Sequence, residues 1–147
     1  MPFVSPIHSL CKDVAQEITD GEWSEDLTAE VRLIVPELAN QFEGYRVSVV
    51  PSERTDELQS RALFESYGQV DVGIQARATT DEEAWKVINL AEEIVAYFRG
   101  ETLETADGIL ASNFEARHRL IYDPESLDTK RVVTSIASLN FRFDLDR

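Results

Sequence analysis

The sequence predicts an α+β domain with a mixed, mostly antiparallel β-sheet and two α-helices packed on one face. Residues 70–79 alternate apolar and polar side chains, which is typical of a strand with one buried face. Residues 81–98 carry apolar side chains at steps of three and four, as an amphipathic helix does. Residues 133–145 alternate again, over a length greater than the usual strand of about five or six residues.

The first helix is expected over residues 6–20. Ser5 is placed to cap its amino terminus, and Pro6 takes a first helical position, where a missing N–H costs nothing. Gly21 follows the last apolar turn and ends the helix. The apolar stripe that should face the sheet consists of Ile7, Leu10, Cys11, Val14 and Ile18.

Two strands are expected before the central strand. Residues 27–35 alternate and end at Pro36, and residues 45–50 are rich in β-forming residues and end at Pro51. A short connection predicts that the two strands are antiparallel. Residues 37–42, within that connection, are expected to form a short helical turn.

Residues 52–68 are charged and show little apolar periodicity. Such a segment is longer than a compact domain usually needs between two strands. It is either a mobile functional loop or an extended hairpin arm, with a disordered surface excursion as the alternative. We favour a loop or arm that meets a partner, with Arg54, Glu57 and Arg61 as interface candidates.

The second helix has clear signals at both ends. Thr80 and Glu83 have the spacing of a capping box, and the acidic first turn suits the helix dipole. Arg99 and Gly100 supply a basic last turn and a C-terminal stop.

Between this helix and the last strand the pattern is weaker. Residues 101–113 are polar and acidic, residues 117–122 suit a short strand, and residues 126–130 suit a turn. The last strand, residues 133–145, is long enough to protrude beyond its own domain, and a protruding edge invites pairing with another copy. Phe141 and Phe143 are the interface candidates in this strand.

Composition indicates a single domain over residues 1–147. No apolar run approaches the roughly 20 residues that a bilayer requires, and the amino terminus lacks the layout of a signal peptide, so we expect a cytoplasmic protein without membrane contact. The 28 acidic and 14 basic residues give a formal charge of −14, which disfavours tight binding of nucleic acid. A carboxylate-lined channel would let a polyanion pass without adhering, although the charge also serves simple solubility.

Catalytic signatures are missing from the sequence. The six glycines are scattered, and Cys11, His8 and His118 are too few and too dispersed to form a zinc site. Cys11 is expected to be a buried side chain of the first helix. We therefore expect a protein that is not an enzyme and has no metal or cofactor.

The order of elements resembles a family of phage proteins. The features that carry the resemblance are the leading helix, L-T-A-E-V-R-L-I-V-P, R-V-S-V-V-P with a charged arm after it, Q-V-D-V-G-I-Q before D-E-E-A-W-K-V-I-N-L-A-E-E-I, and the long final strand. In this order and length the chain resembles the tail terminator and tail completion proteins of long-tailed bacteriophages.

The resemblance implies a sheet flanked by helices in a subunit of a six-membered ring. Such a ring caps the tail tube, stops its polymerisation and presents a surface to the head-neck connector. The implied partners are further copies of the chain, the tail tube protein and a head-completion or neck protein, while DNA passes through the lumen without specific binding. The implied location is the virion, after assembly in the host cytoplasm, and the family has no catalytic residues to carry over.

Two alternatives stay open. A head-tail connector or stopper protein differs from a terminator only in which ring it touches. A monomeric, acidic cytoplasmic binding module, such as an inhibitor that mimics nucleic acid, would concentrate carboxylates on one exposed face and would not self-associate.

Overall fold

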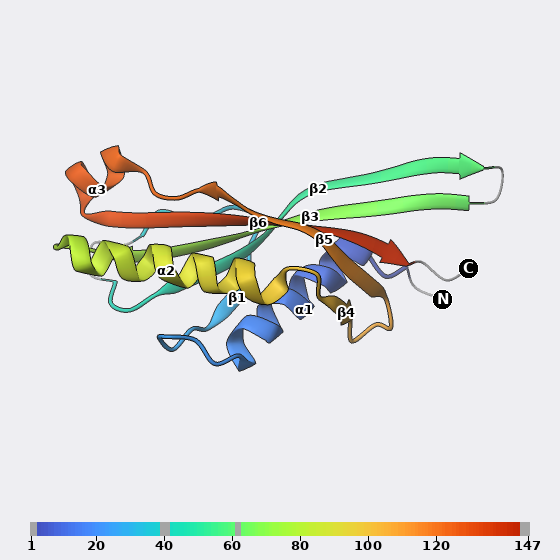
Figure 1. Ribbon diagram of the computed structural model, residues 1–147, viewed down its shortest axis with the longest axis horizontal. Helices are drawn as coiled ribbons and strands as arrows, with labels where there is room; N and C mark the ends of the chain where they lie inside the picture. Colours follow the sequence, from blue (N-terminus) through green and yellow to red (C-terminus); the bar gives the residue numbers. More distant parts are fainter. Residues whose placement is uncertain (1–2, 39–41, 61–62, 145–147) are drawn as a thin grey trace.

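A mixed sheet forms the frame of the molecule, and two long helices lie against one of its faces (Figure 1). The computed structural model describes residues 3–38, 42–60 and 63–144, and within them the strand order is β1-β2-β3-β6-β5-β4. All neighbouring strands are antiparallel except β1 and β2. The α+β prediction is confirmed. The elements are α1 (Pro6–Asp20), β1 (Ala29–Val31), β2 (Arg46–Ser60), β3 (Leu63–Arg77), α2 (Asp81–Phe98), β4 (Thr102–Glu104), β5 (Leu110–Leu120), α3 (Pro124–Lys130) and β6 (Val132–Asp144).

The core lies between the long helices and the sheet. Alternate residues of β3 and β6 point to the helices, so that Val70 stands opposite Leu139 and Val72 opposite Ala137, all fully buried. The apolar stripe of α2 packs against β3, β6 and β5, while α1 packs against β1 and β2. The largest side chains enclosed in this layer are Phe98, Phe141, Leu10, Ile18, Ile74, Leu90, Ile94 and Leu139.

Local capping starts both long helices where the sequence predicts. The Ser5 hydroxyl accepts a hydrogen bond from the His8 N–H at 3.3 Å. The Thr80 hydroxyl accepts from the Glu83 N–H at 3.3 Å, and the Glu83 carboxylate accepts from the Thr79 N–H at 2.9 Å. The predicted capping box is present, with Thr79 in place of Thr80 as the second donor.

The first strand differs from the prediction. It covers only Ala29–Val31, and it is parallel to β2 rather than antiparallel. The reason is that the chain after β1 leaves the sheet edge and crosses the face opposite the helices: the Val35 side chain lies over Gly73, and the Pro36 carbonyl accepts from Gln75 Nε2 at 2.7 Å. This crossing returns the chain to the same end of the sheet. For the predicted helical turn at 37–42, residues 37, 38 and 42 are irregular and 39–41 lie outside the described residues.

The region before the last strand is more regular than predicted. The expected strand at 117–122 is part of the longer β5, and the expected polar segment 101–113 contains β4 and the start of β5. The expected turn at 126–130 belongs to α3, which Asp123 caps by accepting from the Glu125 and Ser126 N–H groups. This helix has no buried residue, so no apolar stripe marks it in the sequence.

The last strand is not an edge strand. β6 lies between β3 and β5 and pairs with both, so the expectation that it offers a free edge to another copy is wrong. The protruding element is instead the hairpin of β2 and β3, which pair with each other out to Ser60 and Leu63, whereas the outermost β3–β6 pair is Ser66 with Phe143. Of the alternatives for residues 52–68, the extended hairpin is observed. We call residues 52–60 and 63–66 the arm; it extends beyond both long helices (Figure 1).

We predict that Cys11 does not react with thiol reagents in the folded protein. The side chain is fully buried, as expected from the sequence, and burial raises the pKa of the thiol from its ordinary value near 9 to about 12. Ellman's reagent at about pH 8 should label no thiol in the native protein and the single thiol in urea. Because the folded-state pKa is the higher one, the stability that this thiol contributes is complete below about pH 9 and is lost as the pH rises towards 12. Rapid native labelling would contradict this placement.

Candidate functional site

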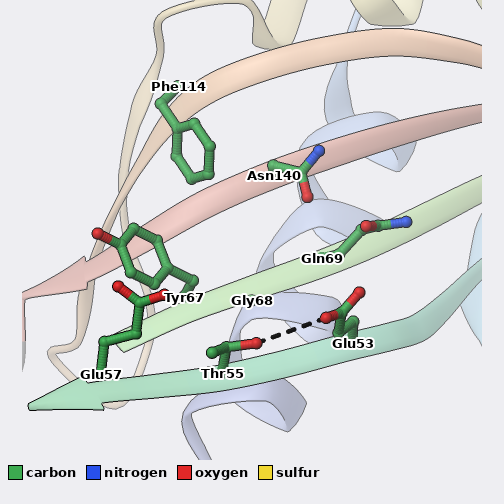
Figure 2. A pocket seen from close by; sticks show the side chains of 8 residues that line it. All are labelled: Glu53, Thr55, Glu57, Tyr67, Gly68, Gln69, Phe114 and Asn140. Atoms are coloured by element: carbon green, nitrogen blue, oxygen red, sulfur yellow. Dashed lines mark hydrogen bonds between the residues drawn. The ribbon is translucent and has the colours of Figure 1, made fainter. Parts of the chain in front are cut away.

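A groove lies at the base of the arm, on the sheet face opposite the two long helices (Figure 2). Its volume is about 310 Å³. Strands β2 and β3 supply most of its wall, because residues opposite each other in an antiparallel pair point to the same face. The lining residues are Glu53, Thr55 and Glu57 from β2, Tyr67, Gly68 and Gln69 from β3, Phe114 from β5 and Asn140 from β6.

Two aromatic rings form one end of the groove. The rings of Tyr67 and Phe114 meet edge to face, with centroids 5.7 Å apart and an interplanar angle of 78°. Phe114 reaches this position because the register of β5 against β6 shifts between Asn113 and Glu115, which leaves Phe114 as the extra residue. The ring remains 60% exposed, so the groove offers an apolar surface to a partner.

Carboxylates surround the rings. Glu53 and Glu57 project from the same face of β2, and the Tyr67 hydroxyl donates a hydrogen bond to Glu65. This hydrogen bond raises the pKa of Tyr67 above its ordinary value. Aromatic faces beside carboxylates attract the cationic side chain of a lysine or arginine. The groove is therefore suited to binding a basic segment.

The arm candidates from the sequence lie on different faces. The Arg54 guanidinium, on the helix side, donates to Asp56 at 3.3 Å and to Ser66 at 3.2 Å, and lies 5.8 Å from the centre of the Phe143 ring. Glu57 lines the groove on the other face. Arg61 lies outside the described residues.

The two phenylalanine candidates belong to the core. Phe141 is fully buried and Phe143 is 4% exposed, so neither ring has surface left for a neighbouring subunit. A Cβ at Gly68 would lie 2.7 Å from the Phe143 ring, which shows how closely this strand and the ring approach each other. The expectation of a subunit contact through these rings is wrong, because strands cover β6 on both sides and the helices cover its apolar face.

Sequence reasoning missed most of the groove. Phe114 follows a polar segment. The feature of the sequence that could have indicated its role is that it is an aromatic residue in a strand whose other side chains are mainly polar. Tyr67, Gln69 and Asn140 carry no local signal, since they meet only through strand pairing. The described residues hold no group of three or more His, Cys, Asp or Glu side chains arranged for a metal ion. None of the described helices is both long and apolar enough to cross a membrane.

Comparison with known proteins supports the fold and no activity. No protein-family model matches the sequence, and no curated protein matches it. Several solved structures match; one of them aligns over 95% of this chain and 94% of its own, with a TM-score of 0.55 and 10% sequence identity. At this identity the likeness shows a shared fold alone.

We predict that two phenylalanines respond differently to truncation. Phe141→Ala removes a fully buried ring and should lower the free energy of unfolding by about 3–5 kcal/mol. Phe114→Ala removes an exposed ring and should cost about 1 kcal/mol or less. Urea unfolding followed by circular dichroism measures both values. Equal losses would contradict the assignment of Phe141 to the core and Phe114 to the surface.

Proposed function

We propose that this chain is a structural assembly protein that closes into a ring of six copies at the head-proximal end of a phage tail tube. There the ring ends tube polymerisation and provides the surface for head-tail joining; the terminator and stopper roles differ only in the neighbouring ring. The partners are further copies, the tail tube protein and a neck protein, and the chain acts in the virion without catalysis. The observation that carries this proposal is the arm (Figure 1).

The arm supports assembly because it has little support of its own. An isolated two-stranded hairpin is marginally stable in water, and this one extends past the last pair that joins β3 to β6. Its exposed described residues are all polar or charged: Ser52, Glu53, Arg54, Asp56 and Glu57. A partner that covers the arm would stabilise it, whereas a chain that acts alone gains nothing from the extension.

The helical layer supports passage of DNA without adhesion. The acidic side chains of α1 and α2 are Asp13, Glu17, Asp20, Asp81, Glu82, Glu83, Glu92 and Glu93, against Lys12 and Lys86 as the basic ones. One of these carboxylates affects a neighbouring side chain: Glu17 accepts a hydrogen bond from the Tyr97 hydroxyl, and this hydrogen bond raises the pKa of Tyr97 to about 12. A surface of this charge repels a polyanion.

The same layer favours a second candidate function. Carboxylates gathered on one helical face are what a monomeric acidic binding module would need in order to mimic nucleic acid. This candidate uses the helices rather than the arm, and it requires no self-association. Solution mass therefore separates the two.

We predict that the purified protein assembles, and that salt promotes assembly. Light scattering should give a mass near six times the 16.6 kDa of one chain, more readily at about 0.3 M salt than at about 0.02 M, because salt screens the repulsion between copies of charge −14. A single-chain mass at every salt and protein concentration would contradict the ring and favour the acidic binding module.

We further predict that shortening the arm removes assembly without unfolding the chain. An Asn-Gly turn that joins Arg54 directly to Gly68 replaces residues 55–67, because these two residues already lie opposite each other in β2 and β3, and it leaves the core pairs from Val70 onward intact. Circular dichroism should show unchanged helix content, and light scattering should show a single chain. An arm-shortened variant that still forms rings would contradict the role of the arm.

A further inference from the structure

The sheet has two long stretches of uncovered edge. Its end strands β1 and β4 are short and pair only with residues 47–49 of β2 and 110–112 of β5. Beyond them, the outer side of the arm at residues 52–60 and the outer side of β5 at residues 114–120 have no strand neighbour within the described part of the chain. Such edges present unpaired N–H and C=O groups to which another strand can bind.

These two edges differ in charge. Among the helices and strands of residues 3–38, 42–60 and 63–144, β5 is the one in which basic side chains outnumber acidic ones, with Arg117 and Arg119 against Glu115. The outer strand of the arm is acidic, with Glu53, Asp56 and Glu57 against Arg54. Although the chain has a net charge of −14, its basic strand β5 lies at an uncovered edge of the sheet.

We propose that the outer edge of the arm pairs with the outer edge of β5 in a second copy of this chain. The inference rests on the proposed ring and names the contact that would hold it together. β2 and β5 lie on opposite sides of the sheet, so the contact joins two different surfaces and repeats head to tail. A head-to-tail contact closes into a ring when its rotation allows closure.

Side chains on the open face suit this pairing. Arg117 lies opposite Ser138, whose hydroxyl donates to Asp71 at 2.7 Å on the face that carries the groove. When the sheet of one copy continues into the sheet of the next with the same face outward, Arg117 of one copy lies alongside Glu53 and Glu57 of the other. Arg117 is free to exchange partners, because its ion pair with Glu115 spans 3.6 Å and more than half of each side chain is exposed.

The paired stretch is short. Register shifts between Pro51 and Glu53 and between Leu58 and Ser60 bound the regular part of the arm, and similar shifts in β5 leave residues 115–118 regular. Bulges of this kind restrict uncontrolled edge pairing. A few backbone hydrogen bonds then act together with charge, which makes the contact reversible and selective for this basic edge.

A charge exchange tests the contact. The arm variant carries Glu53→Arg and Glu57→Arg, and the β5 variant carries Arg117→Glu, while Arg119 is kept because it pairs with the buried Asp71. Alone, each variant should need at least about tenfold more protein than the wild type to assemble, since like charges then meet. An equimolar mixture should assemble within about threefold of the wild type, because both contacts in an alternating ring again join opposite charges.

Controls separate the possible failures. Glu92→Arg makes the same type of charge change on the exposed side of α2 and should assemble as the wild type does. Light scattering measures assembly, and circular dichroism verifies that each variant is folded. Variants that assemble as the wild type does, or a mixture that assembles no better than either variant alone, would overturn the edge contact and leave the ring standing. A wild type that stays a single chain at every concentration would overturn the ring and the contact together.

Discussion

The pairing of β3 with β6 is the interaction on which the rest of this structure depends. It runs from Ser66 opposite Phe143 to Arg77 opposite Val132 and places one apolar row of each strand under the helices. A slip of one residue would turn these rows to the open face, so burial fixes the register. The arm is the continuation of β3 beyond this pairing, and its position therefore follows from the core.

The two faces of the sheet carry different kinds of side chains. The helix side holds the core, and its outer helical surface carries most of the negative charge of the helices. The open side holds polar side chains around Asp71, which accepts a hydrogen bond from the Ser138 hydroxyl and forms an ion pair with Arg119. The groove and both uncovered edges belong to the sheet rather than to the helices. Assembly through the sheet would thus leave the acidic helical surface free to face a polyanion.

Local sequence patterns predict the features that interactions between nearby residues determine, namely where helices begin and which face of a strand is buried. Ser5 and Thr80 begin the long helices through hydrogen bonds within one turn, and the alternation of residues 70–79 reports the buried face of β3. Patterns of this kind cannot show which strand lies beside which. The alternation of residues 133–145 therefore predicts an interface at Phe141 and Phe143, whereas strands on both sides of β6 and the helices enclose these rings. The position of Phe114 depends on a register shift between two strands, and the parallel β1 depends on a crossing of the sheet face.

The claim that assembly proceeds through the sheet edges is tested most directly by amide hydrogen exchange below and above the concentration at which the protein assembles. Residues 53–58 and 115–118 have an uncovered outer edge in the isolated chain, where amides that point outward exchange quickly. We expect both segments to become protected together on assembly, while the exposed side of α2 is unchanged. Protection confined to the helices, with both edges still exchanging as in the single chain, would contradict this account.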